Sequence, residues 1–198
     1  MIELIAFDAD DTLWENEILY LDARVKFEQI LAPFAGIEEI DQRLSDIEIA
    51  NLDVYGYGIK SFALSMIESA LDLSGNKISA IDLQAVIHIV HDILAAEIML
   101  FDEVEETLSI LTEDYPLMLI TKGDLFEQEQ KVARSGLAGY FEFVEVLGQK
   151  TAASYRHLLH RYGQAPEGFL MIRRLLPQTL PYPTRICPNI LTRYYLGK

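Results

Sequence analysis

The sequence has few of the features that mark secreted, membrane or nucleic-acid-binding proteins. Its single cysteine, Cys187, cannot form an internal disulfide, and no apolar run approaches the roughly 18 residues that span a bilayer. The first residues carry neither the basic nor the apolar segment of a signal peptide. Acidic side chains outnumber basic ones 31 to 16, and the net charge of -15 repels nucleic acid and anionic lipid. We therefore expect a cytoplasmic protein that binds neither nucleic acid nor membrane.

Acidic residues are missing altogether from the last part of the chain. Residues 168–198 carry five basic side chains and no acidic one, whereas residues 1–167 carry 31 acidic and 11 basic ones, which gives net charges of +5 and -20. The same segment holds four of the seven prolines, and their spacing leaves no helical or alternating pattern. We expect residues 173–198 to form a mostly irregular tail.

The rest of the chain, in a protein whose residues are 51% apolar, has the pattern of an α/β fold. An apolar strand at 2–7 is followed by helical periodicity up to about residue 97, and from residue 103 onward helices and strands alternate. After a first helix that begins near residue 15, we expect helices at 38–54, 59–73, 79–97, 103–114, 124–135 and 151–162, and further strands at 116–120, 141–147 and 169–172. This order predicts a Rossmann-like parallel sheet, formed by 1–14 and 99–172, with an inserted all-helical domain at 15–98.

Polar side chains follow three of the expected strands. In parallel sheets the ligand site lies beyond the carboxyl ends of the strands, so these side chains are expected to meet there. Two carboxylates two residues apart could bind a divalent cation such as Mg²⁺, or divide into a nucleophile and a proton donor. A hydroxyl and an ammonium group would then hold phosphoryl oxygens. The residues concerned are Asp8, Asp10, Asp11 and Thr12 after the first strand, Thr121, Lys122 and Asp124 after the second, and Gln149 and Lys150 after the third.

Two of these segments resemble motifs of the haloacid dehalogenase superfamily of hydrolases. Residues 7–14, FDADDTLW, resemble its first motif, in which Asp, any residue, Asp, any residue and Thr follow an apolar strand. Residues 119–124, LITKGD, are similar to the second motif, and Lys150 stands where the third motif has its lysine. The helical insertion is placed like the cap domain of this superfamily. The resemblance extends over roughly residues 1–172.

The resemblance implies a reaction and a role for each matching residue. Asp8 would attack phosphorus to form an aspartyl-phosphate, and Asp10 would protonate the leaving oxygen and then activate water. Thr121, Lys122 and Lys150 are the candidate phosphate-binding residues. Mg²⁺ would be bound by the Asp8 carboxylate and the Asp10 backbone carbonyl. The dehalogenase branch lacks a carboxylate at the position of Asp10, which favours a small phosphorylated metabolite as substrate over a haloacid.

The chain departs from the superfamily after residue 172. The fourth motif should place glycine and acidic residues there, but residues 173–178 read RRLLPQ and no carboxylate follows. The third metal ligand is therefore missing, and we hypothesise that a reading-frame shift produced this segment. Alternatively, Arg173 or Arg174 could neutralise phosphate charge, so that binding survives where turnover does not. A sheet edge exposed by the loss of a strand would be covered by the tail or by a second copy of the chain, as a homodimer.

Two other functions stay open at this point. One is a catalytically inactive protein that binds phosphoryl groups or a partner, and a less favoured one is a 2-haloacid dehalogenase. Asp11 and Asp124 are interpreted as turn and helix-cap residues, and His88 and His91 as structural residues.

Overall fold

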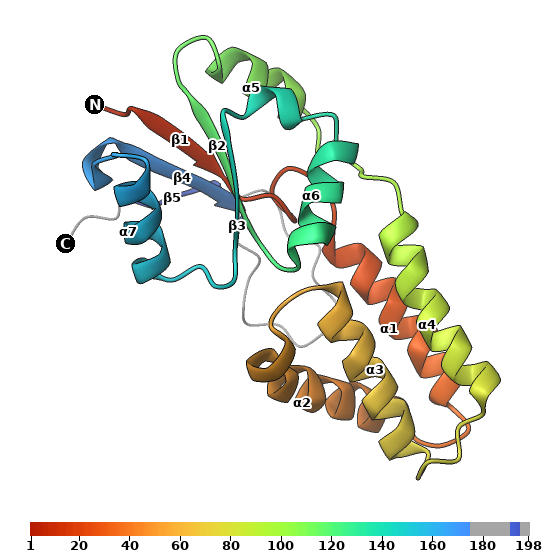
Figure 1. The fold of residues 1–198 in the computed structure, drawn as a ribbon. Helices are drawn as coiled ribbons and strands as arrows, with labels where there is room; N and C mark the ends of the chain where they lie inside the picture. Colours follow the sequence, from red (N-terminus) through yellow and green to blue (C-terminus); the bar gives the residue numbers. More distant parts are fainter. Residues whose placement is uncertain (175–190, 195–198) are drawn as a thin grey trace. The chain divides into compact units, whose positions relative to one another are not determined.

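The described residues form one mixed sheet of five strands in the order β3-β2-β1-β4-β5 (Figure 1). The computed structural model describes residues 1–174 and 191–194, with side chains up to residue 173. Four neighbouring strands are parallel, and β5 runs antiparallel to β4. The strands are β1 (Leu4–Phe7), β2 (Leu117–Lys122), β3 (Phe143–Leu147), β4 (Phe169–Arg174) and β5 (Leu191–Tyr194).

The described residues divide into two compact units. The sheet unit comprises Met1–Asn16, Ile98–Lys122 and the chain from Gln128 onward, and the helical unit comprises Glu17–Glu97 and Gly123–Glu127. The segment Gly123–Glu127, which the sequence analysis placed with the sheet, is thus grouped with the helices. Helix α6 (Leu125–Arg134) begins in this segment and ends in the sheet unit.

Helices cover both faces of the sheet because the buried strands are apolar on both sides. On one face, α7 (Ala152–Arg161) packs on alternate strand residues, which are Leu4, Ala6, Met118, Ile120, Phe169 and Met171. On the other face, α5 (Val104–Leu111) and α6 contribute Leu108 and Val132 to a cluster with Ile5, Phe7, Leu117 and Leu119. Two short 3-10 helices, Ala138–Tyr140 and Pro166–Gly168, precede β3 and β4. The alternation assigns each residue at a strand end to one face.

The helical unit buries a separate apolar core. Its helices are α1 (Glu17–Leu31), α2 (Ile37–Tyr55), α3 (Ile59–Leu73) and α4 (Ala80–Ala95). Phe27, Leu31, Ile40, Leu44 and Met66 are among the side chains in this core. Gly58, between α2 and α3, has a φ of +120°, and a Cβ atom there would lie 2.7 Å from the backbone nitrogen of Asp124. Only glycine fits this approach without displacing backbone.

The α/β class, the parallel sheet and the alternation of helices with strands are confirmed. Within the segment predicted to be mostly irregular, the structure has two short stretches of strand. Strand β4 continues through Arg174, and residues 191–194 form β5. Backbone hydrogen bonds to β4 hold β5, and such bonds need no side-chain pattern, so a four-residue edge strand gave no periodic signal. Residues 175–190 and 195–198 of the predicted tail lie outside the described part of the chain.

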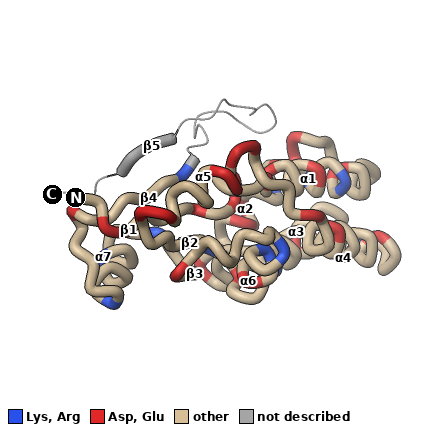
Figure 2. The backbone as a smooth tube through the Cα atoms, turned by 90° about the horizontal axis from the view of Figure 1, so that it is seen from above, with Lys and Arg blue, Asp and Glu red and all other residues tan. Residues whose placement is uncertain are grey.

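Acidic residues are spread along the elements of both units (Figure 2). None of the described helices is long and apolar enough to cross a membrane.

Candidate functional site

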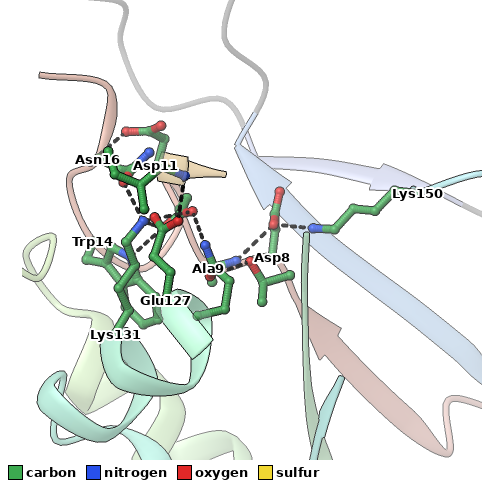
Figure 3. A network of polar contacts seen from close by, with 12 residues as sticks. Asp8, Ala9, Asp11, Trp14, Asn16, Glu127, Lys131 and Lys150 are labelled. Atoms are coloured by element: carbon green, nitrogen blue, oxygen red, sulfur yellow. Dashed lines mark hydrogen bonds and ion pairs between the residues drawn. The ribbon is translucent and has the colours of Figure 1, made fainter. Parts of the chain in front are cut away.

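Asp8 lies directly after β1, and its carboxylate is held on one oxygen. Lys150, from the loop between β3 and α7, forms an ion pair with Oδ1 of Asp8, and the backbone N–H of Ala9 donates to the same oxygen at 2.9 Å (Figure 3). Within the described residues, Oδ2 of Asp8 accepts no hydrogen bond. The structure therefore brings Asp8 and Lys150 together and leaves one carboxylate oxygen open.

The ammonium group of Lys150 is largely buried, with 11% of its side chain exposed. Burial lowers the pKa of Lys150 from its usual range, and the Asp8 carboxylate offsets this only in part. The positive charge of Lys122 lowers the pKa of Lys150 further. An anion that enters beside Lys150 would thus meet a poorly solvated cation, which strengthens their attraction.

Two more cationic residues belong to the face of the sheet on which Asp8 lies. Lys122 follows Ile120 by two residues, and Arg173 follows Met171 by two, so strand alternation assigns both to the face covered by α7. The backbone N–H of Asp8 donates to the carbonyl of Ile172 at 2.9 Å, which places Arg173 next to Asp8 in the register.

The charges of Asp8 and Arg173 both affect the pKa of Tyr155, a residue of α7. Burial raises the pKa of the Tyr155 hydroxyl to about 12, with the Asp8 carboxylate also raising the pKa and Arg173 opposing it. Lys150 thus contacts Asp8 directly, and Lys122 and Arg173 belong to the same face of the sheet.

Asp10 is held by a separate group of donors. The indole N–H of Trp14 donates to Oδ1 at 2.8 Å, and the amide Nε2 of Gln128 donates to Oδ2 at 2.9 Å. The ammonium group of Lys131 lies 3.2 and 3.3 Å from the two oxygens and also donates to Oδ1 of Asn16 at 2.7 Å. Trp14, Asn16 and Lys131 lie close together in Figure 3, apart from Lys150. The carboxylate of Asp10 is thus fixed on both oxygens.

Thr121 belongs to the group around Asp10. Its side chain is buried, and its hydroxyl donates to Oε1 of Gln128 at 2.9 Å. Thr121 follows Leu119 by two residues, so it lies on the face covered by α5 and α6 and not on the face of Asp8. Of the three candidate phosphate-binding residues, Lys122 and Lys150 thus share a face with Asp8, and Thr121 does not.

The family model of haloacid dehalogenase-like hydrolases matches residues 2–172, which include every residue described above except Arg173. The chain belongs to this family. It is also 38% identical to a solved haloacid dehalogenase-like hydrolase of Xanthomonas campestris, with a TM-score of 0.84 over 88% of this chain and 73% of that one. The protein is therefore a hydrolase by family. No curated protein matches the sequence.

More distant solved structures share the fold but differ in activity. A 2-haloacid dehalogenase of Pseudomonas syringae is 24% identical, with a TM-score of 0.58 over 86% of this chain and 77% of that one. A predicted phosphoglycolate phosphatase of Haemophilus somnus is 18% identical, with a TM-score of 0.53 over 86% of this chain and 76% of that one. The comparisons thus give the family and the hydrolase fold but leave the substrate class open.

Gln128 and Lys131 contact Asp10, a candidate site residue, and the sequence analysis missed both. They lie three residues apart in α6, on the same side as Val132, which packs in the core. Two long polar side chains on the apolar side of an amphipathic helix were the available signal, since such groups are buried only with partners. Their partner, Asp10, is more than 100 residues away in the sequence.

Asp11 and Asp124 have the structural roles predicted for them. Asp11 has a φ of +57°, and its Oδ1 accepts a hydrogen bond from the backbone of Asn16 at 2.9 Å. Asp124 begins α6, where its Oδ1 accepts from the backbone N–H of Glu127 at 3.0 Å. The hydrogen bond from Lys60 holds the pKa of Asp124 below its usual range.

The described part of the chain offers few groups of side chains that could bind a metal ion. Within the described part of the chain, no three His, Cys, Asp or Glu side chains lie close enough together to hold a metal ion. His88 and His91 lie on α4 with ring centroids 5.9 Å apart, and no third ligand of these types joins them in that part of the chain.

Proposed function

We propose that this hydrolase cleaves a small phosphate monoester through a covalent aspartyl-phosphate on Asp8. The observation that carries the proposal is the Asp8 carboxylate at the end of β1, held on Oδ1 by Lys150 and the Ala9 N–H and open on Oδ2. A carboxylate fixed in this way can attack without first being ordered. The cationic side chains of Lys122 and Lys150 can take up the negative charge of the transferring phosphoryl group.

The reaction then has two steps. A carboxylate oxygen of Asp8 forms a bond to phosphorus while the bond from phosphorus to the leaving oxygen breaks, and Asp10 gives its proton to that oxygen. In the second step Asp10 removes a proton from water as the water oxygen attacks phosphorus. The Asp8 carboxylate and inorganic phosphate are released, which regenerates the enzyme.

Mg²⁺ is the proposed cofactor, and two oxygen groups of this chain fit it. The Asp8 carboxylate, which is open at Oδ2, and the backbone carbonyl of Asp10 would hold the ion. Mg²⁺ normally keeps several waters and takes substrate oxygens, so two protein ligands suffice for weak binding. When bound, it would supply positive charge to the phosphoryl oxygens. Arg173, next to Asp8 in the register, would weaken cation binding by repulsion.

The test is the hydrolysis of p-nitrophenyl phosphate with and without Mg²⁺, on the wild type and on Asp8→Asn. Asp8→Asn keeps the shape of the side chain and removes the nucleophile, so we expect turnover to fall by about a thousandfold or more. The matched control is Asp114→Asn, which changes an exposed carboxylate in the same unit and should leave turnover unchanged. Turnover that survives in Asp8→Asn would overturn the proposal.

One rival function is favoured by a specific observation, the three cationic residues on the face of the sheet that holds Asp8. A protein with this charge that binds phosphate without turnover would be a phosphoryl-binding protein, and titration calorimetry with inorganic phosphate would detect it. Release of halide from a 2-haloacid would instead indicate a dehalogenase. The small phosphorylated metabolite and the homodimer remain proposals, and the homodimer is tested by light scattering on a size-exclusion column.

A further inference from the structure

Lys122, the last residue of β2, lies beyond the level of Asp8 in the sheet. In the parallel register between β1 and β2, Phe7 pairs with Leu119. Asp8, the residue after Phe7, is thus level with Ile120. Lys122 comes two residues later, which is about 6–7 Å farther along the strand. Its backbone therefore lies farther out, past the point at which Asp8 leaves the sheet.

Lys122 and Lys150 share the face of the sheet on which Asp8 lies, but they differ in their surroundings. The side chain of Lys150 is 11% exposed, and its ammonium group pairs with Oδ1 of Asp8. Lys122 is exposed. The two lysines repel each other electrostatically, so their ammonium groups are near one another. The buried cation is thus engaged at the carboxylate, and the exposed cation faces the solvent side of the site.

The direction of the proposed reaction gives these two cations different partners. The attacking oxygen and the leaving oxygen lie roughly in line with phosphorus between them. The leaving group of a phosphate monoester attacked by Asp8 therefore points away from Asp8, outward from the carboxyl ends of the strands. This is the direction in which Lys122 lies. Two like charges near each other raise the local positive potential, which draws an anionic group of the substrate to the exposed one.

We propose that Lys122 binds a carboxylate on the leaving group, so that the substrate of this hydrolase is a phosphate monoester that also carries a carboxylate. A single ammonium group balances a single negative charge, which fits a carboxylate better than a second phosphate. The substrate class rests on the proposed function, because that function supplies the direction of the leaving group. The position of Lys122 rests on the register alone.

The kinetic test compares 3-phosphoglycerate with glycerol 3-phosphate, in which a hydroxymethyl group replaces the carboxylate. For the wild type, we expect kcat/KM to be about tenfold higher for 3-phosphoglycerate, the size of one charged hydrogen bond. Lys122→Met should slow both reactions, because Lys122 also attracts the phosphoryl group, and it should bring the two kcat/KM values to within about twofold of each other. Lys122→Arg keeps the charge and should keep most of the preference.

The matched control is Lys77→Met, which removes an exposed lysine of the helical unit and should leave both rates and their ratio unchanged. A preference for 3-phosphoglycerate that survives in Lys122→Met overturns the proposal. If Arg173→Met removes the preference instead, the carboxylate binds on the β4 side of Asp8, and the assignment to Lys122 is overturned as well. Lys122→Gln is a second uncharged variant in case Lys122→Met does not fold.

The second readout needs no turnover. Titration calorimetry on Asp8→Asn measures the binding of both compounds, since neither is consumed once the nucleophile is removed. We expect the Kd of 3-phosphoglycerate to be about tenfold lower than that of glycerol 3-phosphate, and we expect the double variant Asp8→Asn, Lys122→Met to lose this difference. Equal Kd values in Asp8→Asn overturn the proposal.

The two readouts distinguish the two failures. A protein that hydrolyses no phosphate ester, but binds 3-phosphoglycerate more tightly in a way that depends on Lys122, contradicts the proposed function alone. A protein that hydrolyses p-nitrophenyl phosphate, but has equal kcat/KM and equal Kd for the two compounds, contradicts the substrate class alone.

Discussion

The charge next to Asp8 would set how strongly the site binds the proposed Mg²⁺. Arg173 takes the register position beside Asp8 on β4, on the same face of the sheet. A guanidinium group stays protonated at any working pH, so its repulsion of a cation is permanent. An acid at this position would add attraction and an oxygen ligand.

We therefore predict that Arg173→Asp lowers the Mg²⁺ concentration needed for half-maximal phosphatase activity by about tenfold, since two charges change within a few ångströms of the ion. A Mg²⁺ titration of p-nitrophenyl phosphate hydrolysis measures this concentration. Arg156→Asp makes the same change at an exposed position of α7 and should alter it by less than about twofold, because exposed charges are screened. Equal effects in both variants would contradict the assignment of Arg173 to the site.

We expect Lys150 to contribute to activity but to stabilise the folded state very little. Its burial disfavours the charged form, as its lowered pKa indicates, while its ion pair with Asp8 offsets this only in part. We predict that Lys150→Met lowers kcat/KM by about a hundredfold. The free energy of unfolding should change by less than about 1 kcal/mol, because the Asp8 side chain is 22% exposed and keeps contact with water when its partner is removed. Urea unfolding and steady-state kinetics measure the two quantities.

The control for this prediction is Lys77→Met, which removes an exposed lysine and should affect neither quantity. A loss of several kcal/mol of stability in Lys150→Met would show that the ion pair is primarily structural.

At the scale of elements, the first turn of α6 provides a pH-dependent contribution to stability. The Asp124 carboxylate accepts from the backbone N–H of Glu127 and from the Lys60 ammonium group at 2.8 Å. Its lowered pKa means that the folded state binds the proton less tightly than the unfolded state. The stabilisation is therefore complete above the unfolded-state pKa of about 3.9 and is lost as pH falls through the lowered pKa.

Asp124→Asn tests this contribution because asparagine still caps the helix but does not titrate. We predict that the variant unfolds more easily than the wild type at pH 7, by less than about 1 kcal/mol because the partner Lys60 is largely exposed. The difference should be smaller at about pH 3, which lies below the unfolded-state pKa. Urea unfolding at both pH values measures it, with Asp114→Asn as the control. A difference that is the same at both pH values would contradict the prediction.

The helices and strands also show how far the sequence could predict the structure. Long elements with a regular apolar period, such as α3 and β2, were predictable because burial on one side dictates the residue type. β5 was not, because a short edge strand is held by backbone hydrogen bonds. The group around Asp10 was not predicted either. Gln128 and Lys131 are far from Asp10 in the sequence, and only the topology of the sheet brings them into contact with it. Asp8 and Lys150 were predictable from their places at strand ends.

At the scale of the whole molecule, the match to the family model and the acidic part of the sequence end within a few residues of each other. The family match ends at residue 172, the net charge is -20 up to residue 167, and the remaining 31 residues carry +5. A protein whose acidic residues are spread over both units has no physical reason to lose them all in one segment (Figure 2). A shift of the reading frame changes the composition from one codon onward and leaves everything before it intact, which agrees with a family match that extends up to residue 172.

We predict that sequencing the gene across this region, with translation of the two alternative frames, places a glycine and an acidic residue directly after Ile172 once one base is added or removed. The acid would lie at the end of β4, near the position changed in Arg173→Asp, and a protein restored in this way should bind Mg²⁺ more tightly, in the same direction as that variant. If neither frame encodes such residues, the basic segment is native. The pairing of β5 with β4 is then the way in which this family member completes its sheet, and the excess of cations around Asp8 is a selected property of the site.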